Sequence, residues 1–172
     1  MKLISSTLLA LTLLSTIVSA EPIKEHTPAP NFTSETVAGK TIRLSDFKGK
    51  VVLLDFGAVE CPPCRLEMPF LEAWSKKYKS QDLVVLGLME MNPKRNQVRE
   101  MLKKRHISFP VAIDVKEKIG GRYGLIAHPT TVLIDQSGNV AKLETGFVLG
   151  DEKEMEIALL ALLHRSSKMG VK

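Results

Sequence analysis

Residues 51–70 read VVLLDFGAVECPPCRLEMPF, and this stretch decides the fold. Its first six residues are mostly β-branched or leucine, which is typical of a central strand covered on both faces. A helix is expected from the cysteines to about Lys79, because an apolar stripe follows them. The expected stripe consists of Leu66, Phe70, Trp74 and Tyr78. A pair of cysteines therefore lies where a buried strand passes into a helix.

Strands and helices alternate through the rest of the chain. The expected strands are 32–37, 41–44, 51–56, 83–88, 130–135 and 140–145. The expected helices are 61–79, 92–105 and one that begins at Asp151, where Asp151 and Glu154 fit a capping box. This order predicts the α/β class, with helices on both faces of a central sheet and a β-hairpin at the N-terminal side.

The N-terminus has the layout of a secretory signal peptide. Lys2 supplies a positive charge, residues 3–18 are uncharged, and small residues precede Glu21. We expect residues 1–20 to be a signal peptide cleaved after Ala20, with an uncleaved membrane anchor as the alternative. Either case predicts export to the periplasm or another extracytoplasmic space. A proline-rich tether is expected at 21–31, one domain at 32–165 and a tail at 166–172.

Length and composition fit one globular domain. The 172 residues are 44% hydrophobic and 25% charged, so the chain has enough apolar side chains for a packed core. The net charge is +5, but aromatic residues make up only 5% and the lysines and arginines cluster on expected helices. We interpret these clusters as solvated helix faces, with attraction to anionic lipid or an acidic partner protein as the alternative, and expect no nucleic-acid partner.

The two cysteines, Cys61 and Cys64, are the whole supply of thiols. A four-cysteine zinc site is excluded by this count, and haem attachment would need His where Arg65 stands. A purely structural disulfide remains an alternative, although so short a loop stabilises little. A redox-active pair fits the position best, and no cofactor beyond this disulfide is expected.

The expected geometry gives the two sulfurs different roles. At the helix N-terminus, unpaired N–H groups and the positive end of the helix dipole favour the thiolate of Cys61, which makes Cys61 the nucleophile. Cys64, one turn further into the helix, would resolve the mixed disulfide by attacking Cys61. Pro62 and Pro63 restrict the loop backbone and remove two N–H donors.

Several motifs, in order along the chain, carry a resemblance to a known family. They are Ala29-Pro30-Asn31-Phe32, LSDFKGKVVLL at 44–54, CPPCRLEMP at 61–69, Tyr123-Gly124 and PTTVLID at 129–135. On these motifs the chain resembles the thioredoxin superfamily, and within it the TlpA/ResA-like exported thiol–disulfide oxidoreductases. The resemblance covers residues 30–162 and implies a thioredoxin-like fold with a central mixed β-sheet.

The resemblance also implies roles for residues outside the cysteine motif. Pro129 matches the family's cis-proline, which packs beside the active-site sulfurs, and His128 before it is implied to contact the substrate polypeptide. Asp55 stands where thioredoxin itself has a buried aspartate that exchanges protons with the second cysteine, although many TlpA-like members have Asn there. Glu67 matches a glutamate that this branch keeps near its cysteines, and a carboxyl buried beside a thiol can accept the proton of Cys64. The alternative for each acid is structural: a strand-end hydrogen bond for Asp55 and an exposed helix position for Glu67.

Glu60 departs from the family, which usually has Trp before the first cysteine. A carboxylate beside Cys61 should oppose thiolate formation unless it pairs with Arg65 or a lysine. The branch that acts in cytochrome c maturation usually has Glu where Thr130 stands, so that role is not assigned. The expected substrates are disulfide-containing exported proteins, which the enzyme would reduce with electrons from a membrane thiol donor of the DsbD/CcdA type.

Other activities remain as alternatives to a reductase. An exported disulfide oxidase or isomerase would use the same pair of cysteines. A copper-handling module could draw on Cys61, Cys64 and His128, with thioethers from Met89 and Met91. A peroxiredoxin is disfavoured, because Ala58 and Leu54 stand where that family needs a hydroxyl residue and a proline.

Overall fold

The central feature of the structure is a five-stranded mixed sheet. The computed structural model describes residues 22–169, with side chains up to His164, so the expected signal peptide lies outside the described residues. The strands are β3 (Val51–Gly57), β4 (Leu83–Met89), β5 (Val111–Ile113), β6 (Thr130–Ile134) and β7 (Val140–Thr145). Their order is β5-β4-β3-β6-β7, with β3 parallel to β4 and antiparallel to β6. The mixed sheet implied by the resemblance is confirmed.

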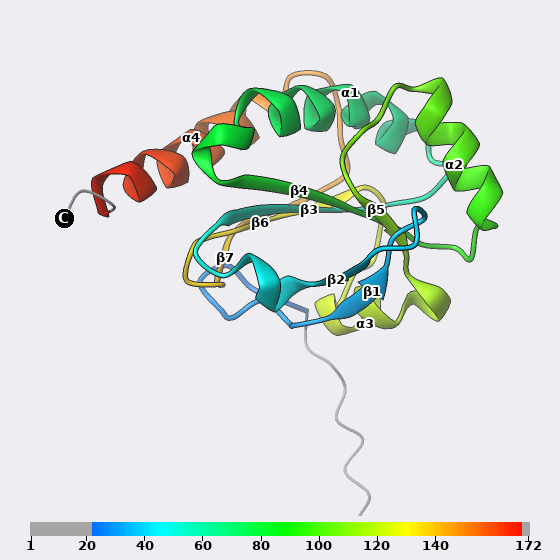
Figure 1. Ribbon diagram of the computed structural model, residues 1–172, viewed down its shortest axis with the longest axis horizontal. Helices are drawn as coiled ribbons and strands as arrows, with labels where there is room; N and C mark the ends of the chain where they lie inside the picture. The colour runs from blue at the N-terminus through cyan, green and yellow to red at the C-terminus, as the bar shows by residue number, and fades with distance from the viewer. Residues whose placement is uncertain (1–21, 170–172) are drawn as a thin grey trace, which may run out of the picture.

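Helices cover both faces of this sheet (Figure 1). One face carries α1 (Pro62–Lys77), α2 (Arg95–Lys104) and α4 (Asp151–Met169). The other carries α3 (Lys118–Tyr123) and the separate hairpin of β1 (Thr33–Glu35) and β2 (Thr41–Arg43). Short 3-10 turns occupy Leu44–Phe47, Lys79–Gln81 and Val115–Glu117.

Strand β3 lies at the centre of the sheet, and every one of its residues is buried. Val51 and Leu53 pack toward the α1 and α4 face, whereas Val52, Leu54 and Phe56 pack toward α3 and the hairpin. This alternation explains the unbroken apolar run, since a strand covered on both faces needs apolar side chains at every position. Asp55 is the one charged residue in this run, and it is buried as well.

Helix α1 buries only part of the expected stripe. Leu66 is 49% exposed and Phe70 only partly buried, while Met68 and Leu71 lie in the core with Trp74 and Tyr78. At 3.6 residues per turn, each step of four residues rotates about 40° beyond a full turn. A stripe spaced strictly four apart therefore starts outside the core and rotates into it along the helix.

Two elements were absent from the sequence-based expectation. Strand β5 has three residues and α3 has six, two of them Gly120 and Gly121, so neither shows a readable period. The helix expected at 92–105 begins later, at Arg95. Helix α4 begins at Asp151 as expected, but Asp151 accepts a hydrogen bond from the Val148 N–H (2.8 Å) and Glu154 pairs with Lys142 (3.7 Å). The predicted capping box is thus replaced by contacts to neighbouring segments.

The described part of the expected tether lies against the domain. The His26 N–H donates to the Val140 carbonyl (2.7 Å), and the Ala29 N–H donates to the Gly138 carbonyl (3.0 Å). The Tyr123 hydroxyl donates to the Pro30 carbonyl at 2.8 Å. The packed unit therefore begins before Phe32, and helix α4 continues into the segment expected to be a tail.

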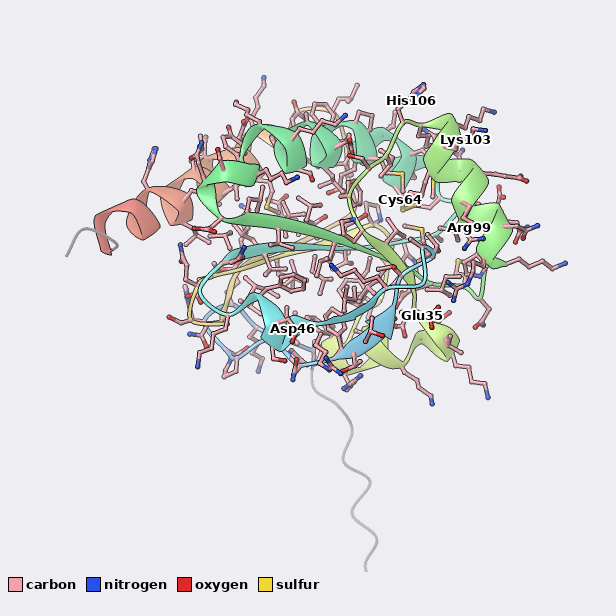
Figure 2. All side chains as sticks on the ribbon, viewed as in Figure 1. Glu35, Asp46, Cys64, Arg99, Lys103 and His106 are labelled. Carbon is pink, nitrogen blue, oxygen red and sulfur yellow. A yellow bond between two sulfur atoms is a disulfide. The ribbon has the colours of Figure 1, made fainter. Side chains whose placement is uncertain are left out.

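Two arginines on the exposed face of α2, as expected, also hold the hairpin onto this helix. Arg99 Nε and Nη2 donate to the Val37 carbonyl at 2.9 and 2.7 Å, and Arg95 pairs with Glu35 at 2.9 Å. Figure 2 shows Arg99 and Lys103 on α2. Within residues 22–169, no helix combines the length and the apolar character that crossing a membrane requires.

Candidate active site

Cys61 and Cys64 form a disulfide at the N-terminal end of α1, with an S–S distance of 2.04 Å. Cys61 is the N-cap residue with extended backbone, and its Sγ accepts a hydrogen bond from the Cys64 N–H at 3.2 Å. Pro62 and Pro63 open the helix, where the missing N–H groups have no helical partner to lose. Helix α1 thus begins at the cysteine motif because Cys61 caps it and prolines are well tolerated in the first turn of a helix.

The two sulfurs differ in exposure. Cys61 is partly exposed, whereas Cys64 is 2% exposed and lies at the end of α1 nearest α2 (Figure 2). Gly57 lies beside this sulfur, since a Cβ added there would be in ordinary van der Waals contact with Cys64 Sγ, at 3.4 Å. Cys61 is consequently the more accessible of the two sulfurs.

The peptide bond between His128 and Pro129 is cis. In the β3–β6 register Thr130 pairs with Phe56, and continuing that register by one residue sets Pro129 opposite Gly57. The Pro129 carbonyl accepts a hydrogen bond from the Gly146 N–H at 2.8 Å. The cis-proline therefore stands beside the residue that adjoins Cys64.

Two carboxyls lie buried between the strand and the helix that flank the cysteine motif. Asp55 is 1% exposed and Glu67 is 6% exposed, and Thr131, paired with Asp55 across the sheet, donates its hydroxyl hydrogen to Glu67 Oε1 (2.5 Å). Among the described residues, Asp55 Oδ1 and Glu67 Oε2 are buried without a hydrogen-bond partner. Such unpaired oxygens are costly, and they cluster where proton transfer is needed.

Both carboxyls bind their protons tightly. Burial raises the pKa of Asp55 well above its ordinary value, and repulsion from nearby Glu67 adds to the rise. Burial likewise raises the pKa of Glu67 to about 7. The hydrogen bond from Thr131 lowers this pKa, and the negative charges of Glu144 and Asp151 raise it by smaller amounts. A group with this pKa is close to half ionised at neutral pH, so it is suited to exchange protons with a thiol.

Glu60 is exposed at the entrance of the site. The hydrogen bond of Arg65 runs from Nη1 to the Val59 carbonyl (3.5 Å), and no ion pair among the described residues includes Glu60. Neither Arg65 nor a lysine therefore forms the ion pair that could offset the charge of Glu60 beside Cys61, among the residues that the structure describes.

The two methionines considered as copper ligands separate. Met89 is fully buried in β4, whereas Met91 is 66% exposed. No group of three or more histidine, cysteine, aspartate or glutamate side chains within the described residues has a metal-binding arrangement.

Sequence reasoning missed three members of the site. Gly57, Thr131 and Glu90 contact Cys64, Glu67 and His128 respectively. Glu90 carries the one signal that a sequence could have offered, a carboxyl directly after a buried strand. The other two depend on strand register, which the sequence alone does not determine.

A CXXC disulfide between a buried strand and a helix, next to a cis-proline, is the arrangement of the thioredoxin-like thiol–disulfide oxidoreductases, and this chain has it. It belongs to the Redoxin family, whose model matches residues 24–159.

Similar proteins carry names of the same class. Thioredoxin-like protein YneN from Bacillus subtilis (strain 168) is 35% identical over 138 residues, which span 80% of this chain and 81% of that protein. Thiol-disulfide oxidoreductase ResA from the same organism is 36% identical, over 73% of this chain and 70% of its own. A crystal structure of a DsbE-type thiol:disulfide interchange protein from Chlorobium tepidum has a TM-score of 0.77 at 33% identity, covering 82% of this chain and 99% of that one.

Proposed function

We propose that this protein reduces disulfides in exported proteins through a mixed disulfide at Cys61. The observation that carries the proposal is the asymmetry of the pair: Cys61 is partly exposed and Cys64 is buried, and the strand and helix on either side of the motif each carry a buried carboxyl of raised pKa. Export rests on the signal-peptide pattern of residues 1–20.

The reaction begins with the reduced pair. The Cys61 thiolate attacks one sulfur of the substrate disulfide, and the other substrate sulfur leaves as a thiolate. Cys64 then gives its proton to the carboxylate of Glu67 or Asp55 and attacks Cys61 Sγ, which releases the second substrate thiolate. The substrate has gained two electrons and the enzyme pair has lost two.

Charge around the pair supports the reducing direction. Strongly oxidising enzymes of this chemistry are those whose reduced, thiolate form is stabilised. Here the Glu60 carboxylate, which has no ion pair among the described residues, adjoins Cys61 and disfavours its thiolate. The reduced form is thus less favoured, and the pair should give up electrons readily.

Continued turnover needs a source of electrons. In an oxidising compartment the Cys61–Cys64 disulfide must be reduced again by a dithiol donor, and a membrane carrier of the DsbD/CcdA type fits this requirement. The cis-proline loop at His128 and Pro129 would receive both the substrate and this donor.

Two measurements test the proposal. The equilibrium reduction potential against glutathione should lie near about −270 mV, whereas a value near about −120 mV would show an oxidase instead. In the native host, the variant C64S should accumulate covalent mixed disulfides through Cys61. The matched variant C61S should capture none of these chains, and equal recovery from both variants would contradict the assignment of the nucleophile.

A further inference from the structure

Glu90, outside the residues assigned above to the chemistry, connects the two sides of the active site. It follows β4 directly and is 3% exposed. Its Oε2 lies 2.5 Å from His128 Nε2, and its backbone N–H donates to the Gly57 carbonyl at 2.9 Å. One buried residue therefore contacts both the cis-proline loop and the end of the strand that adjoins Cys64.

The fold reserves space for this carboxyl. A Cβ added to Gly120 would lie 1.8 Å from Glu90 Oε1, so only glycine leaves room for the side chain as it stands. Asp114 lies close by on the same side and accepts hydrogen bonds from the Ile119 and Gly120 N–H groups, at 2.8 and 2.7 Å. Glu90 Oε1 has no hydrogen-bond partner among the described residues.

Glu90 also forms part of a hollow of about 230 Å³ beside the cysteine motif. Ala58, Val59 and Glu60, the three residues that lead to Cys61, line the same hollow. Glu90 consequently lies between the loop that carries Cys61 and the loop that carries Pro129.

Burying the Glu90 carboxyl between two loops costs desolvation free energy. Burial raises the pKa of Glu90, the contact with His128 lowers it, and Asp114 raises it again. An apolar side chain of the same size would avoid the desolvation cost, and replacing buried charged groups in this way is often neutral or stabilising. Stability alone therefore gives no reason for Glu90, whereas holding His128 in one orientation does.

We propose that Glu90 is a positioning residue that acts through His128 to hold the cis-proline loop in the shape that receives a substrate polypeptide. The inference rests on the proposed function, because it assumes that polypeptides dock along this loop. Without Glu90 the loop samples other arrangements, and a substrate must select the competent one, which weakens binding before the chemical step.

The test is a double-mutant cycle on the full mature chain. The variant E90M keeps the volume but removes the contact, E90Q keeps a polar partner for His128, and H128A removes the other end. A fluorogenic peptide with one internal disulfide is the substrate, and excess dithiothreitol supplies electrons. KM and kcat are measured separately for each variant and for the double variant E90M/H128A.

We expect E90M to raise KM by about tenfold, as for the loss of one hydrogen bond to a charged group, with kcat within about twofold of the parent. E90Q should restore most of the parental KM. In the H128A background, E90M should change KM by less than about twofold, because the route through His128 is already gone.

The matched control is E72Q, which alters another buried glutamate. Glu72 lies on α1, eight residues after Cys64, and accepts a hydrogen bond from the Ser108 hydroxyl. E72Q should leave KM unchanged. An unchanged KM in folded E90M, a loss confined to kcat, or effects of E90M and H128A that multiply would each overturn the positioning role. Failure of the parent protein itself to reduce the peptide would instead count against the proposed function.

Discussion

Replacing Glu67 with Gln should change how the stability of the disulfide form depends on pH. Glu67 has a pKa of about 7 in the folded protein, against an ordinary value of 4.5. The folded state therefore binds the proton more tightly than the unfolded state, and stability falls as pH rises from 4.5 through about 7. At about 1.4 kcal/mol for each tenfold change in proton affinity, the loss from this one group is about 3 kcal/mol.

Urea denaturation of the oxidised protein at pH 5 and pH 8, at one ionic strength, measures this loss. The parent should lose about 3 kcal/mol more of its unfolding free energy between the two pH values than E67Q does. Asp55 remains in the variant and its raised pKa acts in the same direction, so E67Q should retain some decline of its own.

The control for this experiment is E72Q. Hydrogen bonds from Lys76 and Ser108 lower the pKa of Glu72 despite the opposing effect of burial, so its contribution to stability is lost only as pH falls below its ordinary range. E72Q should therefore follow the parent between pH 5 and pH 8. If E67Q and the parent lose the same unfolding free energy between pH 5 and pH 8, the raised pKa of Glu67 in the folded protein is refuted.

Two further outcomes follow from the site and from helix α1. In E60W, loss of the charge beside Cys61 should increase the thiolate fraction of the reduced protein, so iodoacetamide alkylation at pH 7 should speed up by about threefold; an unchanged rate would show that Glu60 does not act on this sulfur. M68A should cost about 2–5 kcal/mol of unfolding free energy because Met68 is buried, whereas L66A should cost less than about 0.5 kcal/mol because Leu66 is exposed. Equal costs in urea denaturation would contradict the orientation of α1.

The agreement between sequence and structure is best where a signal is local. The apolar run of β3 and the cysteine pair before a helix need only their own neighbours to be recognised. Where contacts between distant segments decide, the local pattern misled: residues 22–31 read as a tether, but they lie along β7 and α3. Leu66 read as core for a related reason, because the face that α1 buries depends on how the helix lies across the sheet.

The sequence by itself determined the α/β class, the central strand and the placement of Cys61 and Cys64 at a strand–helix junction, because these follow from periodicity, turn residues and helix ends. Only the tertiary structure decided that Glu67 hydrogen-bonds Thr131 and that Glu90 meets His128. These pairs join residues far apart in the chain, so strand register and packing bring them together, and the low dielectric created by burial shifts the pKa of each acid.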